Sequence, residues 1–364
     1  SGFDVDTSIA GIVSTANAIP ETAAEKAAAA KVITDAAAAA AAKVITDAAD
    51  AADAAVVAAA KLIADAKVVS DAAAAQAILD AAAKIVTDAA AKVVADDAAA
   101  LAADTSKTLT TGVNTFTTNV GDDSFDGSTA SSLDTSDVLD GGAGTDSLNA
   151  SFTATESLRP TLTDIETVQL TVSSGFTSTL DTRSITGATK YVDESSAGSV
   201  TLNNIAAVTD VEITSSTAGT TTINYTDAAI AGSSDTQNLT VNNVSGTNVT
   251  ITDAGGTTNE LETLAITSTS LASTITTLST AGVETSKLTV AGDADLTITN
   301  VLDSGILTLD AGTATGAVSV SLASASAAVT ATGGSGDDSI TAGAFVDTIT
   351  GGAGADTLSF ATAN

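Results

Sequence analysis

The sequence lacks cysteine, histidine, methionine and tryptophan, and its 364 residues include only two prolines, two tyrosines and seven phenylalanines. Without cysteine the chain forms no disulfides, and without cysteine and histidine the usual protein ligands of zinc and haem are missing. Nucleophilic catalysis of the Ser-His or Cys-His kind is excluded for the same reason. Neither terminus offers a membrane span, and the start, Ser1-Gly-Phe-Asp4, is no basic, apolar signal peptide.

Positive charge is scarce as well. Lys and Arg number 12 against 44 Asp and Glu, which gives a net charge of -32. Binding to nucleic-acid phosphates needs a positive field, so nucleic acid is not an expected partner. A chain this acidic, with so few bulky side chains, resembles proteins that bacteria export in bulk, and this predicts an extracellular location.

The composition changes sharply near Asp104. We divide the chain into an N-terminal extended segment (1–20), an Ala-rich domain (21–106), a Thr/Ser/Gly-rich region (107–332) and a C-terminal repeat region (333–364).

Alanine dominates the second segment, which has no glycine between Glu21 and Thr111. Because alanine is the strongest helix former, we expect a helix over roughly 21–104, beginning after Pro20. A single rod of that length would extend about 125 Å, whereas a hairpin or bundle would be shorter. Six Lys-aliphatic-aliphatic-small-Asp pentads recur at irregular steps and share no single face, which argues against a coiled coil. We expect packing against other helices, in this chain or a neighbouring copy; the alternative is a marginally stable, solvated helix.

From Lys107 onward, short apolar–small–apolar triplets recur, with Gly, Asn or Asp between them. This period of two is typical of half-buried strands. The triplets include Leu239–Val241, Val249–Ile251, Leu264–Ile266, Leu288–Val290, Leu296–Ile298, Leu307–Leu309 and Val318–Val320. A longer motif occurs twice, as Ile165-Glu-Thr-Val and as Leu261-Glu-Thr-Leu. Very short strands, scarce aromatics and the nonapeptides that follow favour a stacked parallel coil over a sandwich.

Residues 333–359 divide without a gap into three nonapeptides, with Asp at each sixth place and an aliphatic residue at each eighth. The glycines permit a tight turn whose carbonyls point inward, and Asp adds a hard anionic oxygen of the kind that calcium prefers. This is the pattern of the calcium-binding repeat of the RTX β-roll. Turns two repeats apart stack in such rolls, so we expect an ion between Asp338 and Asp356. The middle repeat, with Asp347, lacks two of its three glycines. The candidate ligands here are Asp338, Asp347, Asp356, Gly333, Ser335, Gly351 and Ala353.

A second cluster of similar turns occupies residues 118–149. The nonapeptide 141–149 matches fully, the preceding nine residues keep Asp137 in phase, and a degenerate turn contains Asp123. Its candidate ligands are Asp123, Asp137, Asp146, Gly141 and Ala143. The competing interpretation, ordinary turns without metal, is stronger here than at the C-terminal repeats.

Over residues 107–360 the chain resembles bacterial RTX-type surface-layer proteins and related surface proteins exported by type I secretion. The resemblance rests on Ser136–Asp146, Ile165–Val168, Leu288–Ile298 and the closing repeats. It implies export by type I secretion to the bacterial surface, with Ca2+ driving folding and lattice assembly there. Two features depart from the family: the Ala-rich segment, and an end five residues after the last repeat, where such proteins continue into a secretion signal.

Together these observations predict a two-part α + β fold, with an N-terminal Ala-rich long helix, helical hairpin or bundle followed by a parallel β-solenoid or RTX β-roll. The expected function is structural and not enzymatic: a calcium-binding protein that assembles with copies of itself into an extracellular layer, sheath or filament. The alternative is an adhesin or extension module that binds a polysaccharide, host or ice surface. A polysaccharide-degrading β-helix enzyme is disfavoured because the basic residues of the β region are dispersed: Lys107, Arg159, Arg183, Lys190 and Lys287.

Overall fold

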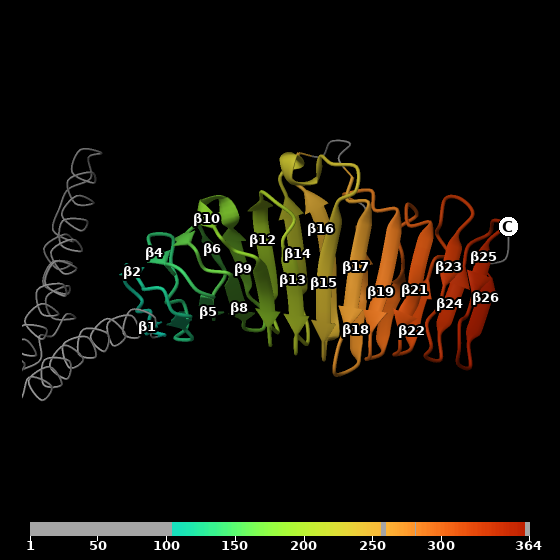
Figure 1. The fold of residues 1–364 in the computed structure, drawn as a ribbon, viewed down its shortest axis with the longest axis horizontal. Helices are drawn as coiled ribbons and strands as arrows, with labels where there is room; N and C mark the ends of the chain where they lie inside the picture. The colour runs from blue at the N-terminus through green and yellow to red at the C-terminus, as the bar shows by residue number, and fades with distance from the viewer. Residues whose placement is uncertain (1–103, 256–259, 281, 361–364) are drawn as a thin grey trace, which may run out of the picture. The chain divides into compact units, whose positions relative to one another are not determined.

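A computed structural model describes residues 104–255, 260–280 and 282–360 of the chain. These residues belong to one compact unit, Ala103–Asn364. They form a parallel β-solenoid, in which each coil places its strands beside the equivalent strands of the next coil (Figure 1). The strands pair in parallel from the first coil to the last.

Two long sheets form the walls of the solenoid. The twelve-stranded sheet contains, in order, β1 (Ser106–Thr108), β3 (Ser124–Gly127), β5 (Ser147–Phe152), β8 (Thr167–Val172), β11 (Lys190–Glu194), β13 (Asp210–Thr214), β15 (Thr236–Asn242), β17 (Thr263–Ser268), β19 (Lys287–Gly292), β21 (Thr308–Ala314), β23 (Thr330–Thr332) and β25 (Thr348–Thr350). The ten-stranded sheet contains β6 (Glu156–Leu158), β9 (Thr177–Asp181), β12 (Ser199–Ile205), β14 (Thr220–Tyr225), β16 (Ser245–Asp253), β18 (Ser273–Ser279), β20 (Leu296–Val301), β22 (Val318–Ser321), β24 (Ser339–Ala342) and β26 (Thr357–Phe360).

The remaining elements are short. A four-stranded sheet contains β2 (Thr115–Thr117), β4 (Val138–Asp140), β7 (Thr161–Thr163) and β10 (Ile185–Thr186). Two 3-10 helices, η1 (Thr182–Ser184) and η2 (Asp227–Ile230), are the only helices in the described part of the chain, and neither could cross a membrane.

The core is a stack of aliphatic side chains that alternate with exposed or half-buried polar ones along most of the strands. In β8 every second residue is buried, and the partners of Val168 in the neighbouring coils are Leu148 and Tyr191. A strand this short cannot bury its apolar face alone, but a column of coils can. The triplets predicted as strands are confirmed: Leu239–Val241, for example, lies inside β15 with both aliphatic ends buried.

Coil length varies along the rod. It is 18 residues at the first described coil, where Ser106 pairs with Ser124, and again at the last, where Thr330 pairs with Thr348. It is 28 residues between β13 and β15, because this coil carries the excursion that contains η2, and 29 residues between β16 and β18 (Figure 1). The last coil therefore has the length of two nonapeptides, as the C-terminal repeats require.

The predicted two-part α + β class is wrong for the part of the chain that the structure describes. These residues are parallel β throughout, with helix confined to η1 and η2. The predicted Ala-rich helix, and the extended segment before it, lie outside the described residues. Only the solenoid half of the predicted fold corresponds to the observed architecture.

Candidate calcium sites

The sixth-place aspartates of the first and third C-terminal nonapeptides lie directly above one another. Asp338 precedes β24 and Asp356 precedes β26, and these two strands pair in register. The Asp356 Oδ1 atom accepts the backbone N–H of Asp338 at 3.0 Å, and Asp338 Oδ1 accepts that of Val318 at 2.8 Å. Each carboxylate therefore binds the backbone of the preceding coil. The structure thus brings together the two aspartates between which the sequence predicts an ion.

The middle nonapeptide lies at the other edge of the solenoid. Its Asp347 precedes β25, in the twelve-stranded sheet, and its Oδ1 atom accepts the backbone N–H of Val329 at 2.9 Å. The Asp347 Oδ2 atom is buried without a hydrogen-bond partner. Asp347 therefore repeats the contact of Asp356. It is not part of the C-terminal column, by which we mean the stacked turns of Asp338 and Asp356.

The first-place glycines leave room for these carboxylates. A Cβ atom on Gly333 would lie 2.4 Å from Asp338 Oδ2 and 2.0 Å from the carbonyl oxygen of Gly351. A Cβ atom on Gly141 would likewise lie 2.4 Å from Asp146 Oδ2 and 2.0 Å from the carbonyl oxygen of Asp164. Any side chain at these places would displace two oxygen atoms that converge on one point. This convergence is the local reason why the repeat begins with glycine.

The third-place residues join successive turns through their backbone. The N–H of Ser335 donates to the Ala314 carbonyl at 3.0 Å, and that of Ala353 donates to the Gly334 carbonyl at 3.0 Å. In the N-terminal cluster the N–H of Ala143 donates to the carbonyl of Asn119 at 3.1 Å. These contacts hold the carbonyl-rich turns against one another.

The N-terminal cluster forms a second column, which includes two of its three predicted aspartates. Asp146 Oδ1 accepts the backbone N–H of Asp123 at 2.7 Å, although the two residues are 23 positions apart. Asp137 lies elsewhere, before β4, and its carboxylate accepts the backbone N–H groups of Asn114 at 2.7 Å and Asp134 at 2.9 Å. The structure therefore groups Asp123 with Asp146 and separates Asp137 from both.

The electrostatic environment differs between the aspartates of the N-terminal column. Burial raises the pKa of Asp146, and repulsion from Glu166, Asp123 and Asp122 raises it further. Burial also acts to raise the pKa of Asp123, but hydrogen bonds, above all from Thr118, outweigh it and lower that pKa. Asp146 is 1% exposed, and its Oδ2 atom has no hydrogen-bond partner. A buried anionic oxygen beside three further carboxylates calls for a cation.

Burial likewise raises the pKa of Asp137. Both of its oxygens bind backbone N–H donors, as do those of Asp338, whose Oδ1 accepts from Val318 at 2.8 Å and whose Oδ2 accepts from Gly334 at 2.7 Å.

The residues of both columns fit a calcium ion. Calcium takes six to eight oxygen ligands, and the stacked turns offer inward carbonyls and a carboxylate in each repeat. No three acidic side chains within the described ranges converge on one metal-sized point, so backbone carbonyls have to supply most of the ligands. Oxygens that converge at Gly333 and Gly141, together with the unpartnered Oδ2 atom of Asp146, match this requirement. A bound ion would neutralise the carboxylates and join the stacked turns.

The family model for the RTX calcium-binding nonapeptide repeat matches residues 133–152 and 332–362, in four copies. Both matched segments are RTX-type calcium-binding repeats. Calcium is the ion that RTX repeats bind, as the sequence predicted, and RTX repeats imply an extracellular protein exported by type I secretion. No curated protein is recognisably similar to the chain.

The matched segments do not include every turn of the RTX columns. The turn before Asp123 lies outside them, yet it stacks on 141–146. Sequence reasoning also missed the separate role of the fifth-place acids. Asp337 Oδ1 accepts the backbone N–H of Ala355 at 2.7 Å, and Asp122 Oδ1 accepts that of Thr145 at 2.8 Å. In each Asp-Asp pair the first aspartate therefore binds the coil that follows, and the second binds the coil that precedes. The Asp-Asp doublet in the sequence is the feature that could have predicted this double contact.

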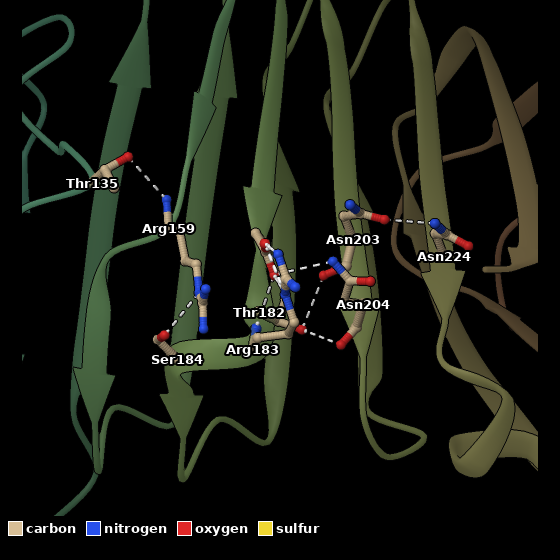
Figure 2. Close-up of polar contacts among 9 residues, drawn as sticks. Thr135, Arg159, Thr182, Arg183, Ser184, Asn203, Asn204 and Asn224 are labelled. Carbon is tan, nitrogen blue, oxygen red and sulfur yellow. Dashed lines mark hydrogen bonds and ion pairs between the residues drawn. The ribbon is translucent and has the colours of Figure 1, made fainter. Parts of the chain in front are cut away.

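The N-terminal half of the solenoid carries a different polar cluster, which includes Arg159 and Arg183 (Figure 2). The Arg183 guanidinium forms an ion pair with Asp181 and lowers the pKa of that carboxyl to about 2. Asn204 donates to the same carboxylate at 3.1 Å, and Arg159 Nε donates to Ser184 Oγ at 3.0 Å. In this cluster Arg183 neutralises the Asp181 carboxylate.

Proposed function

We propose that this chain is a calcium-ordered structural protein that assembles with copies of itself into an extracellular layer, sheath or filament. The observation that carries the proposal is the in-register stacking of Asp338 on Asp356 in a coil of two nonapeptides. In such a coil the calcium ligands come from neighbouring turns, so the site is complete only when the coils are stacked. Calcium binding would therefore stabilise the stacked coils.

Charge supports the calcium dependence. From residue 107 onward the chain has 29 Asp and Glu but only five Lys and Arg, a net charge of -24. Repulsion among these carboxylates opposes a compact rod, and bound cations relieve it. Calcium outside the cell would therefore complete folding only after export.

The last described coil supports the assembly. Two large apolar side chains are exposed in the turn between β24 and β25: Val346 is 93% exposed and Phe345 51%. Neighbouring exposed apolar residues are a feature through which proteins associate. In this proposal a second copy of the chain covers them.

A structural role also suits the placement of the cations. Three of the five basic residues from 107 onward form ion pairs: Arg183 with Asp181, Lys190 with Glu212 and Lys287 with Asp310. A polysaccharide-cleaving site needs a basic group beside its carboxylates that is not already neutralised. We therefore propose that the chain is not an enzyme.

Electron microscopy and light scattering of the purified chain, with calcium and with excess chelator, test this function. We expect ordered polymers only with calcium. The double variant D338A/D356A should fail to assemble, whereas D210A/D310A, which removes two exposed carboxylates, should assemble like the unchanged chain. A protein that stays monomeric at all calcium concentrations would contradict the assembly proposal.

A further inference from the structure

The two copies of the repeated motif, Ile165-Glu-Thr and Leu261-Glu-Thr, make the same contact in the structure. Glu166 Oε2 accepts the backbone N–H of Asp146 at 2.7 Å, and Glu262 Oε2 accepts that of Asp235 at 2.7 Å. In both cases the glutamate lies one coil after the aspartate and directly precedes a strand of the twelve-stranded sheet. A glutamate here takes the role that the next sixth-place aspartate has in the C-terminal column.

The surroundings of the two aspartates differ. Asp146 belongs to a complete nonapeptide, is 1% exposed, and has an Oδ2 atom with no hydrogen-bond partner. Asp235 is half-buried, and its Oδ2 atom accepts the backbone N–H of Gly232 at 2.9 Å. Only the first glutamate therefore stands beside a buried carboxylate oxygen that lacks a partner.

The turn before Glu166 also takes the place of an RTX turn. At Gly333 the space of the missing Cβ is flanked by Asp338 Oδ2 and by the carbonyl oxygen of Gly351, the first residue of the next stacked repeat. At Gly141 the same space is flanked at the same distances by Asp146 Oδ2 and the carbonyl oxygen of Asp164. Asp164 adopts a left-handed backbone with φ of 47°, a conformation that the glycines of RTX turns provide elsewhere.

We propose that the turn Asp164–Glu166 completes a calcium site with the nonapeptide 141–149, the Asp164 carbonyl and the Glu166 carboxylate supplying oxygen ligands in place of a second repeat. Asp146 contributes its Oδ2 atom, and Asp122 and Asp123 add negative charge. The Asp164 carbonyl oxygen and Asp146 Oδ2 converge near Gly141, and no hydrogen-bond donor reaches Asp146 Oδ2. A hard divalent cation such as calcium binds oxygen atoms arranged in this way. The N-terminal RTX cluster thus holds its ion although the repeat pattern stops at residue 149. This inference rests on the calcium binding of the proposed function.

Calcium titration calorimetry on the full chain tests the inference with a matched pair of variants. E166Q and E262Q each remove one carboxylate and keep an oxygen that accepts the backbone N–H, so their net charges are equal. We expect E166Q to lose one calcium ion or to bind it about tenfold or more weakly, because a charged ligand is gone. E262Q should titrate like the unchanged chain. The calcium-induced rise in melting temperature should fall in E166Q alone.

The outcomes separate this inference from the proposed function. If the unchanged chain binds no calcium, the proposed function fails, and the inference fails with it. If the chain binds calcium and E166Q titrates like it, or if E166Q and E262Q weaken binding equally, the inference is overturned while the function stands. Circular dichroism checks the fold of E166Q. Should E166Q be unfolded, E166D keeps the charge on a shorter side chain; weaker binding by that variant supports the site, and unchanged binding overturns it.

Discussion

Asp356 Oδ1 accepts the backbone N–H of Asp338 at 3.0 Å, across one coil of 18 residues. Asp146 makes the same contact with Asp123 at 2.7 Å, across a coil of 23. A carboxylate that accepts a backbone N–H fixes how far one coil is displaced against the next, since a shift by one residue would break the contact. The sixth-place aspartates therefore set the register of the stack and also offer oxygens to an ion. Loss of such an aspartate should impair both functions.

Replacement of Asp356 tests this double role. D356A removes a carboxylate from the stacked pair, whereas D310A removes an exposed one that pairs with Lys287 at 3.4 Å and accepts the backbone N–H of Gly312 at 3.4 Å. We expect D356A to weaken calcium binding and to lower the melting temperature in calcium. D310A should leave both nearly unchanged, because an exposed ion pair is worth about 0–1 kcal/mol. Equal calorimetric titrations for the two variants would count against the site.

Chelation should loosen the β-solenoid. The excess of carboxylates over cations makes the stack self-repelling, and the repulsion is strongest where acids face each other across coils, as around Asp146 and Glu166. We expect excess chelator to lower the melting temperature and to speed amide hydrogen exchange in β24 and β26. Magnesium at equal concentration is the control, because its smaller octahedral shell fits carbonyl-lined turns poorly. Unchanged exchange in chelator would refute the prediction.

Gly333 should not tolerate a side chain. A Cβ atom there would meet the Gly351 carbonyl at 2.0 Å and Asp338 Oδ2 at 2.4 Å, so the turn must open. Gly112 has only Thr110 Oγ1 near, at 3.9 Å from its Cβ position. We expect G333A to cost about 2–4 kcal/mol of unfolding free energy and to abolish calcium binding at that turn, and G112A to cost less than about 0.5 kcal/mol. Denaturant unfolding in calcium, with calorimetry, measures both, and equal stabilities would contradict the steric argument.

The strand positions were predictable because each coil repeats a local rule. A triplet such as Leu239–Val241 buries both ends whatever the loops between the triplets do. Predictions at the strand boundaries were less accurate. The triplet at Leu307 begins one residue before β21, and Leu307 is only half-buried.

The grouping of the turns was only partly predictable. Two nonapeptides make one coil at the C-terminus, so the stacking of Asp338 on Asp356 follows from their spacing. In the N-terminal cluster Asp123 and Asp146 stack across 23 residues, and Asp146 meets Glu166 across 20 residues. Neither separation is a multiple of the nonapeptide. Which turns meet there depends on loop lengths that local patterns do not encode.

The Asp181–Arg183 pair should contribute to stability only above acidic pH. The pKa of Asp181 is lowered to about 2 in the folded chain, from an ordinary value of 3.8, by its hydrogen bonds and ion pair with Arg183. A depressed carboxyl pKa stabilises the fold above the unfolded pKa, and this stabilisation is lost as pH falls from about 4 to about 2. Because Arg183 is 55% exposed, we expect D181N to cost no more than about 1 kcal/mol at pH 7. The difference from the unchanged chain should vanish near pH 2. Denaturant unfolding at both pH values in chelator decides it, and a pH-independent difference would contradict the assignment.

The buried carboxyl of Asp193 should have the opposite pH dependence. Its oxygens accept from the hydroxyls of Thr221 and Ser216, and burial raises its pKa in the folded chain. A raised carboxyl pKa favours the fold below the unfolded value, and that stability is lost as pH rises through the folded pKa. An amide at this place keeps an acceptor for Thr221, and its N–H can donate to Ser216 Oγ. We therefore expect D193N to raise unfolding free energy at pH 7 by about 1–2 kcal/mol, since a neutral hydrogen-bonded group replaces a buried charge.

The gain from D193N should shrink as pH falls through the raised pKa of Asp193, because the carboxyl then takes up a proton in the folded chain. D210N is the matched control, because Asp210 is exposed and accepts only from Asn238 at 2.9 Å. Its effect should stay within about 0.5 kcal/mol at both pH values. Unfolding curves for both variants in chelator separate this effect from calcium binding. A D193N variant that is less stable than the unchanged chain at pH 7 would show that the charged carboxylate, and not the shape of the site, is what Thr221 and Ser216 hold in place.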